Sequence, residues 1–560
     1  MNEFFQTPPQ LGNQYTEDHV LNTYLQWKMP PLILQELESE FQRMGHRVVT
    51  DIYHLGKAAE ATPPRHIPYD AWGKRIDRIE LADAWKELDR VSATEQLVAI
   101  GYERKHGEFS RIHQFVKLYL FHPSSAIYTC PLAMTDGAAR ALELYGSEAL
   151  KNNAFAHLTS SDPDKFWTSG QWMTERTGGS DVSTTSTIAK PEGQNYRLYG
   201  TKWFTSATTS QMAMTLARIE GAPEGSKGLS LFYLELRDAD GTLNGIRINR
   251  LKDKLGTRAL PTAELELTGA LAIPVGGPGD GVKKISSLFN ITRIYNACCA
   301  VGYMRRAIAL ARDYAMKRKA FGRPLAEHGL HLETLSAMHV EFTAAFHLVF
   351  HAIELLGKDE TGKATQAESA ILRLLTPLVK LYTAKQAISV VSEALEAFGG
   401  AGYIEDTGLP HLLRDAQVLS IWEGTTNVLS LDVLRSIRKE NAAEPFLEGI
   451  QERINKVQAK ELDASKKKTQ DALDALKHYI NTMSAMSDAE QQLVARSFAF
   501  SMVQTFAAGL LVECADYWLQ KGTNPQALIV ADRWCAKNLT QLITPSQVHQ
   551  DGSKILALDL

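Results

Sequence analysis

The chain has 560 residues, a length that typical domain sizes divide into roughly three to four domains. Hydrophobic residues make up 44% and charged residues 22% of the sequence, which is ordinary for a globular protein with buried cores. The formal net charge of -4 gives no electrostatic argument for a nucleic acid or an anionic membrane as partner, so function must be sought in individual sites.

The first third of the chain is expected to be helical. Apolar spacing near three and four predicts helices over residues 20–43, 83–106 and 111–120. Prolines between the first two predict an irregular loop over residues 63–72, because proline removes an N–H donor and restricts the residue before it. We therefore expect residues 1–169 to form an α-helical domain.

From about residue 170 the hydrophobic period changes to two. Alternating or β-branched runs at 194–199, 212–218, 229–236 and 262–268 are separated by turn residues, which predicts a small β domain over 170–285. Its last segment, Gly276-Gly-Pro-Gly-Asp-Gly281, lacks the spacing and the strand-to-helix context of a dinucleotide-binding loop. We interpret it as a flexible connection between domains.

Helical spacing then returns. Runs at 297–319, 330–356, 367–397 and 428–438 predict an antiparallel bundle over residues 286–438. Pro377 is expected to kink or divide its helix, and Gly399 with Gly400 to end it. Residues 439–560, notably 489–519, predict a further helical region, so the fold class is α+β, mainly α.

Five cysteines, Cys130, Cys298, Cys299, Cys514 and Cys535, form no Cys-x-x-Cys pair and are odd in number, which indicates neither a disulfide framework nor a zinc site. The first ten residues lack a signal or transit pattern, and the last five are no peroxisomal signal. No window of about twenty apolar residues is free of charge. We expect a cytoplasmic protein without a membrane span.

Two stretches carry the groups that most suggest chemistry. One reads Trp172-Met-Thr-Glu-Arg-Thr-Gly-Gly-Ser-Asp181; the other reads Glu396-Ala-Phe-Gly-Gly-Ala-Gly-Tyr-Ile-Glu-Asp406 and leads into Arg414-Asp-Ala-Gln-Val-Leu-Ser-Ile-Trp-Glu-Gly-Thr-Thr-Asn427. Backbone N–H groups beside hydroxyls and glycines suit a large cofactor with phosphates. Taken alone, the first stretch is better explained as a capped turn. Glu423 could equally be a base or an N-capping glutamate.

A third motif, Trp203-Phe-Thr-Ser206, favours a flavin, because an indole can lie against a tricyclic ring while a hydroxyl donates to it. Metal chemistry has little support: His328, His331, Glu333 and His339 show no His-Glu-x-x-His pattern, so we expect no metal site. No Gly-x-Ser-x-Gly elbow supports a serine hydrolase.

These motifs, in this order, resemble the acyl-CoA dehydrogenase superfamily over about residues 150–435, and most of all its AidB branch. The likeness to that branch extends to Phe5-Gln-Thr-Pro-Pro, Tyr69-Asp-Ala-Trp-Gly-Lys-Arg-Ile-Asp77 with Trp85, and Leu251-Lys-Asp-Lys-Leu-Gly256. The resemblance implies FAD as cofactor. It also implies an N-terminal helical domain, a central β-barrel domain, a four-helix bundle and an extra C-terminal helical domain.

The resemblance implies site residues as well. FAD would be contacted by Thr174, Trp203, Phe204, Thr205, Thr425 and Asn427, with Thr205 donating to the flavin, and a neighbouring subunit's FAD by Arg318, Phe321, Gly399, Gly400 and Gly402. Acyl-CoA would be contacted by Ser180, Arg293 and Gly424. A cofactor shared in this way implies at least a dimer, commonly a tetramer built as a dimer of dimers.

Glu423 matches the catalytic base of that superfamily. The resemblance implies FAD-dependent oxidation of a fatty acyl-CoA to the trans-2-enoyl-CoA: Glu423 removes the α-proton, the β-hydride goes to flavin N5, and an electron-transfer flavoprotein accepts the electrons. Burial would raise the pKa of Glu423 toward that of its weakly acidic target. The alternative is an AidB-like flavoprotein that binds or sequesters acyl-CoA with little turnover.

Binding of nucleic acid has less support. Residues 437–560 hold 14 Lys and Arg against 15 Asp and Glu, a net charge of -1, and the single basic run Lys466-Lys467-Lys468 is typical of a solvated helix face. Three positions depart from the family pattern: Trp172 replaces a small residue, Glu396 a glutamine and His411 a frequent lysine. We expect the wide side chain of Trp172 to alter the acyl pocket or the exposure of the flavin.

Overall fold

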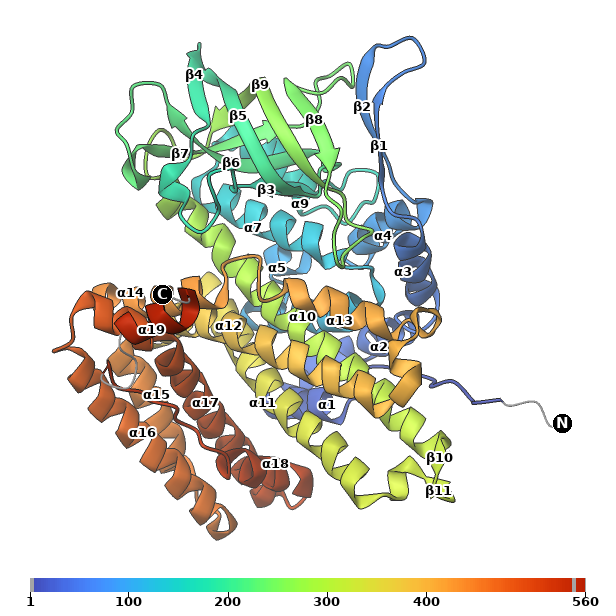
Figure 1. Ribbon diagram of the computed structural model, residues 1–560, viewed down its shortest axis with the longest axis vertical. Coiled ribbons are helices and arrows are strands. Elements are labelled where there is room, and N and C mark those ends of the chain that lie inside the picture. The colour runs from blue at the N-terminus through green and yellow to red at the C-terminus, as the bar shows by residue number, and fades with distance from the viewer. Residues whose placement is uncertain (1–4, 546–549, 559–560) are drawn as a thin grey trace.

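The computed structural model describes residues 5–545 and 550–558. Figure 1 shows a sheet at one end of the molecule, a group of N-terminal helices beside it, and long helices that extend away from it. This mainly helical α+β architecture confirms the predicted fold class. Our expectation that neither terminus carries a targeting signal rests partly on residues 1–4 and 559–560, which lie outside the described residues.

The N-terminal helices confirm the prediction over 111–120 but divide the runs predicted over 20–43 and 83–106. They are α1 (His19–Lys28), α2 (Pro31–Arg47), α3 (Asp51–Ala61), α4 (Asp83–Thr94), α5 (Ile100–Glu103), α6 (Ser110–Phe121) and α7 (Thr129–Tyr145), followed by the single turns α8 (Glu148–Leu150) and α9 (Ala156–Leu158). The helix predicted over 20–43 divides because Pro31 can occupy the first turn of α2 but could not continue α1. The helix predicted over 83–106 is interrupted where Gln96 takes a φ of 55°.

The loop predicted over residues 63–72 is wrong. β1 (Arg65–Tyr69) and β2 (Arg75–Glu80) form an antiparallel hairpin in that region. The pairing register shifts between Ile67 and Tyr69, which places Pro68 at the irregularity. A two-stranded hairpin tolerates proline at such a point because no ladder hydrogen bond is needed there.

The central sheet closes on itself. Its strands are β3 (Ser169–Trp172), β4 (Ile188–Glu192), β5 (Asn195–Ser206), β6 (Met212–Ile219), β7 (Leu229–Glu235), β8 (Ile246–Leu251) and β9 (Thr262–Pro274). Hydrogen-bonded neighbours follow in the order β6, β4, β5, β9 and β7, and β7 pairs again with β6. In addition, β3 pairs with β6 and β8 pairs with β9. Trp172 is 0% exposed inside this sheet domain, packed with Leu198, Ala213 and Phe232. Our expectation that Trp172 shapes an acyl pocket or flavin exposure is therefore not supported.

Long helices follow the sheet. They are α10 (Gly281–Lys317), α11 (Gly329–Glu360), α12 (Gln366–Ala397), α13 (Leu409–Val418) and α14 (Thr426–Glu440). α12 runs through Pro377 without a break, so the predicted division is absent, and it ends before Gly399, whose φ of 61° agrees with the predicted stop. A second bundle, α15 (Ala443–Lys456), α16 (Asp463–Met483), α17 (Asp488–Lys521) and α18 (Pro525–Cys535), lies beside α11 and α12, and α19 (Gln550–Leu558) ends the chain's described part (Figure 1).

Two of these helices, α11 and α17, are long and apolar enough to cross a membrane. In this structure 89% and 83% of their most apolar windows are buried inside the protein. Their composition is therefore accounted for by their position in the cores of the two bundles.

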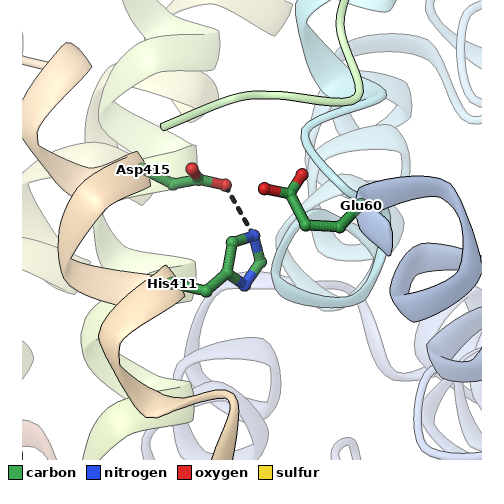
Figure 2. Close-up of side chains that lie close together, drawn as sticks. All are labelled: Glu60, His411 and Asp415. Carbon is green, nitrogen blue, oxygen red and sulfur yellow. Dashed lines mark ion pairs between the residues drawn. The ribbon is translucent and has the colours of Figure 1, made fainter. Parts of the chain in front are cut away.

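Three ionisable side chains join α13 to α3. Figure 2 shows Glu60 of α3 opposite His411 and Asp415 of α13, with the imidazole between the carboxylates. The ligand atoms of the three lie within 4.8 Å of one another, and His411 Nε2 is 2.9 Å from Asp415 Oδ2. Asp415 also accepts hydrogen bonds from the Thr257 N–H (2.6 Å) and the Tyr303 hydroxyl (3.2 Å). This cluster ties the N-terminal helices, the loop before β9 and α10 to the helix that precedes Glu423.

The charge state of this cluster follows from its surroundings. Burial acts to lower the pKa of His411, but the negative charges of Asp415 and Glu60 outweigh it, so the pKa of His411 is raised. Burial and the charge of Asp415 raise the pKa of Glu60. The raised pKa favours the protonated form of His411, which carries a positive charge as the lysine of the family pattern does.

We predict that His411 makes stability depend on pH. Because its folded-state pKa is raised, its contribution is complete below the unfolded value of about 6.5 and is lost as pH rises through the folded value. Thermal melts from pH 6 to pH 9 should show a smaller loss for His411→Lys than for the wild type, since lysine stays charged over this range. The exposed His478→Lys serves as control. An equal slope in wild type and His411→Lys would contradict the prediction.

Candidate active site

Glu423 lies in the loop between α13 and α14 with a left-handed backbone. Its φ is 57°, and Gly424 follows with a φ of 97°. Such a conformation costs a residue with a Cβ atom about 1–2 kcal/mol, so contacts must hold it. The Gln171 amide donates to Oε1 (3.2 Å) and the Thr292 hydroxyl donates to Oε2 (2.6 Å). Both carboxylate oxygens are thereby fixed between β3 and α10.

The surroundings adjust the basicity of this carboxylate. Burial raises the pKa of Glu423, while the Thr292 hydrogen bond and the charges of Arg293 and Lys380 partly oppose the increase. The net pKa remains raised. A positioned carboxylate of raised pKa is suited to take a proton from a weak acid.

Trp203 and Phe204 leave the regular strand. The register between β5 and β9 shifts between Lys202 and Thr205, so the two aromatic residues lie in a bulge, with Trp203 half-buried and Phe204 56% exposed. The backbone N–H of Trp203 donates to the Thr174 carbonyl (2.9 Å). The Thr205 hydroxyl donates to the Ala263 carbonyl (2.7 Å), which leaves it no proton for the predicted hydrogen bond to a flavin in this conformation.

Strand β3 and the residues that follow it connect the Glu423 carboxylate with the backbone of Trp203. Gln171 holds Glu423, and Thr174, three residues further on, accepts from Trp203. Three extended residues span about 10 Å. The end of β3 and the residues after it therefore link Glu423, Thr174 and Trp203, which the sequence predicts for one site.

A buried ion pair fixes the turn that follows β3. Glu175 accepts from Lys202 Nζ (2.8 Å), and their side chains are 2% and 0% exposed. The Ser186 N–H and hydroxyl (both 2.6 Å) and the Thr187 N–H (3.2 Å) donate to the same carboxylate. Burial acts to raise the pKa of Glu175, but the Lys202 charge and these hydrogen bonds hold it at about 2. Sequence reasoning missed this role of Glu175, since nothing in a turn motif marks a carboxylate as buried.

The glycines of this turn leave space for a ligand. A Cβ atom at Gly179 would come within 2.5 Å of the Thr174 hydroxyl oxygen, and one at Gly178 would meet nothing within 4 Å. Ser180, the predicted CoA contact, is exposed beside them. The half-buried Thr174, the exposed glycine turn and the half-buried Trp203 offer a hydroxyl, backbone N–H groups and an indole, which fit the polar groups and the ring of a flavin cofactor.

Three arginines pair with Asp432 of α14, the helix that follows Gly424. Arg293 donates to Asp432 (2.7 Å), which also accepts from Arg373 (3.0 Å) and from Arg435. Their charges help to lower the pKa of Asp432 to about 2 against the effect of burial. Arg293, the predicted acyl-CoA contact, is thus already paired. Arg373 also pairs with Glu440 (2.9 Å), so three guanidinium groups face two carboxylates and one positive charge is left in excess.

The remaining predicted residues fall into two places. Thr425 and Asn427 follow Glu423 in the chain. Thr425 caps α14 by accepting from the Val428 N–H (3.5 Å), and Asn427 accepts from Arg496 (3.3 Å). Arg318, Phe321, Gly399, Gly400 and Gly402 lie at the other end of α13, where Phe398 packs on Tyr314 of α10 with ring centroids 4.6 Å apart. The ten residues of α13, about 15 Å of helix, separate this second group from Glu423.

We predict that loss of Glu175 destabilises the protein and empties the flavin site. Glu175→Ala leaves Lys202 buried and unpaired, which typically costs about 3–5 kcal/mol. Urea denaturation should show this loss, and the visible flavin absorbance should fall. Glu192→Ala, which removes an exposed partner of Arg197, should cost no more than about 1 kcal/mol. Equal stability and flavin content in the two variants would contradict the role assigned to Glu175.

Comparison with known families covers nearly the whole chain. Residues 6–165 match the adaptive response protein AidB N-terminal domain, 170–270 the acyl-CoA dehydrogenase middle domain, and 279–438 the acyl-CoA dehydrogenase C-terminal domain. Residues 441–559 match a domain described as acyl-CoA dehydrogenase 11 C-terminal domain-like. The family matches follow the order of the motifs found in the sequence.

Relatives support the same assignment. The chain is 45% identical over 552 residues to acyl-CoA dehydrogenase family member 11 of Caenorhabditis elegans, covering 95% of this chain and 89% of that protein. The crystal structure of C. elegans ACDH-11 in complex with C11-CoA superposes with a TM-score of 0.96 at 43% identity, covering 100% of this chain and 97% of that one. Putative acyl-CoA dehydrogenase AidB of Escherichia coli is 33% identical, covering 72% of this chain and 74% of AidB.

A more distant structure agrees on the fold alone. Acyl-CoA dehydrogenase from Bacillus anthracis, solved with FAD, has a TM-score of 0.75 at 19% identity, over 95% of this chain and 90% of that one. The family matches and the identity to full-length relatives together show that the chain belongs to the FAD-dependent acyl-CoA dehydrogenase family, in its AidB-like branch.

Proposed function

We propose that the protein oxidises a fatty acyl-CoA to the trans-2-enoyl-CoA, with Glu423 as the base that removes the α-proton. One observation carries this proposal: the Glu423 carboxylate is held on both oxygens, by Gln171 and Thr292, in a turn that the backbone would otherwise avoid. A glutamate that only capped α14 would need no such support, and the capping position is taken by Thr425.

Different residues bind the cofactor, accept the proton and position the base. Thr174, the Gly178–Gly179 turn and Trp203 hold the cofactor, and bound FAD supplies the acceptor for the β-hydride. Glu423 accepts the α-proton on its carboxylate. Its raised pKa brings it closer to the weakly acidic α-carbon and so reduces the free energy of the proton transfer. Gln171 and Thr292 keep the carboxylate from turning away, which preserves the geometry that the reaction needs.

The charge of the arginine cluster and the ligand bound to a relative indicate the substrate class. The excess positive charge around Arg293, Arg373 and Arg435 suits the anionic CoA portion, and Ser180 and Gly424 are the further contacts that we propose for the substrate. C. elegans ACDH-11 has been solved with C11-CoA, and we extend an acyl chain of similar length to this protein.

Assembly would complete the site. Phe321 is 98% exposed on the hairpin formed by β10 (Lys319–Ala320) and β11 (Arg323–Pro324), and Gly399 and Gly400 are exposed close by. Since this group lies away from Glu423 in its own chain, we propose that it contacts the FAD of a second chain in a dimer or tetramer. An electron-transfer flavoprotein in the cytoplasm is the electron acceptor we propose.

We predict that the purified protein is yellow and that anaerobic undecanoyl-CoA bleaches the oxidised flavin band. Glu423→Gln should keep FAD and ligand binding but reduce the flavin at least about 100-fold more slowly, because a positioned general base is worth about that much or more. The exposed Glu192→Gln is the matched control and should behave as wild type.

The same titration decides between catalysis and ligand binding. If a series of acyl chain lengths binds the wild type tightly and none bleaches the flavin, the protein is a binder that sequesters acyl-CoA. Equal bleaching by wild type and Glu423→Gln would remove Glu423 from the mechanism.

A further inference from the structure

A lysine buried in α12 supports the loop of the proposed base from behind. Lys380 is 0% exposed, and its Nζ donates to the carbonyl of Gly424 at 2.6 Å. Removing an ammonium group from water is costly, and burial lowers the pKa of Lys380 to about 7. Sequence reasoning gave this residue no role, because it lies within an ordinary helical run 43 positions before Glu423.

Lys380 contacts the part of the loop in which the backbone φ angles are positive. Glu423 and Gly424 both have positive φ, and Gly424 presents its carbonyl toward α12. Below its pKa of about 7 Lys380 is charged, and a charged donor makes a stronger hydrogen bond to a carbonyl than a neutral one does. Lys380 thus holds the loop from α12, while Gln171 and Thr292 hold the carboxylate from β3 and α10.

Lys380 is also the least neutralised cation near Glu423. Around the carboxylate are Gln171 of β3, Thr292 and Arg293 of α10, Lys380 of α12 and the buried thiol of Cys130 of α7. Arg293 is paired with Asp432. Lys380 makes no ion pair within the described part of the chain. Lys385 of the same helix and Arg293 lower the pKa of Lys380 further, and Glu423 is the carboxylate whose charge opposes the effect of burial on it.

We propose that Lys380 is a positioning residue for the base: it fixes the Glu423–Gly424 turn through the Gly424 carbonyl and keeps the Glu423 carboxylate ionised and able to accept a proton. The inference rests on the proposed function for its kinetic consequence. Its structural consequence, a coupling between Lys380 and Glu423, is independent of turnover.

The kinetic test compares three variants of the FAD-loaded protein. Lys380→Met removes the charge and the hydrogen bond, and Lys380→Gln removes the charge but keeps an N–H donor. The control is Lys467→Met, which removes an exposed charge from α16, a helix that carries none of the groups around Glu423. The readout is the pH dependence of anaerobic flavin reduction by undecanoyl-CoA. Loss of a nearby positive charge raises the pKa of a carboxylate by about one unit or more.

We expect the acid limb of the profile to move to higher pH by about one unit in Lys380→Met and in Lys380→Gln, with rates about tenfold lower at acidic pH. Lys380→Gln should melt closer to wild type than Lys380→Met, because it can restore the hydrogen bond. Lys467→Met should show the wild-type profile. An unchanged acid limb in a folded, FAD-containing Lys380 variant would overturn the proposal.

A double-mutant cycle tests the coupling without turnover. Urea denaturation is measured for wild type, Lys380→Gln, Glu423→Gln and the double variant. Lys380→Gln should lower the urea midpoint less in the Glu423→Gln background, where the opposite charge is already gone. Additive shifts would reject the coupling. A wild type that never bleaches would refute the proposed oxidation while leaving this cycle decisive for Lys380.

Discussion

The placement of one carboxylate in a left-handed turn is the constraint on which the rest of the site depends. Glu423 cannot hold a φ of 57° at no cost, and three separate elements compensate that cost: β3 through Gln171, α10 through Thr292 and α12 through Lys380. The closed sheet fixes β3, and packing of α10 against α12 fixes the other two. The base is thus positioned by the meeting of a barrel and a bundle, and neither could position it alone.

Basic side chains, buried or half-buried, recur at the joints between segments of this molecule. Lys202 anchors the turn after β3 through Glu175, His411 joins α13 to α3 through Asp415 and Glu60, and Lys380 supports the loop after α13. Each joint lies next to a segment assigned to the site. Buried charges that lose a partner are strongly destabilising, so these joints hold the site segments in one arrangement.

Much of this could be predicted from the sequence. The change of hydrophobic period at about residue 170 predicts the sheet domain, Gly399 predicts the end of α12, and the motif order predicts the family that the comparisons show. Glu423, Thr174 and Trp203 could be named because residue type and motif both point to them. Their neighbourhood in the structure follows from contacts along β3.

Other features could not be predicted, for identifiable reasons. Gln171 and Thr292 lie 252 and 131 positions from Glu423, and no local pattern reports a contact over such distances. Pro30 and Pro31 divide a helix that the apolar spacing alone makes continuous. Trp172 is large where the family pattern is small, yet only the structure shows that its side chain fills the sheet domain.

The claim that Glu423 removes an α-proton is tested most directly by isotope exchange. FAD-loaded protein is incubated anaerobically in D2O with an excess of undecanoyl-CoA, and deuterium at the carbon next to the thioester carbonyl is measured by mass spectrometry. The account predicts incorporation with the wild type and none above background with Glu423→Gln. Equal incorporation with both proteins, or none with either while the ligand is bound, would contradict it.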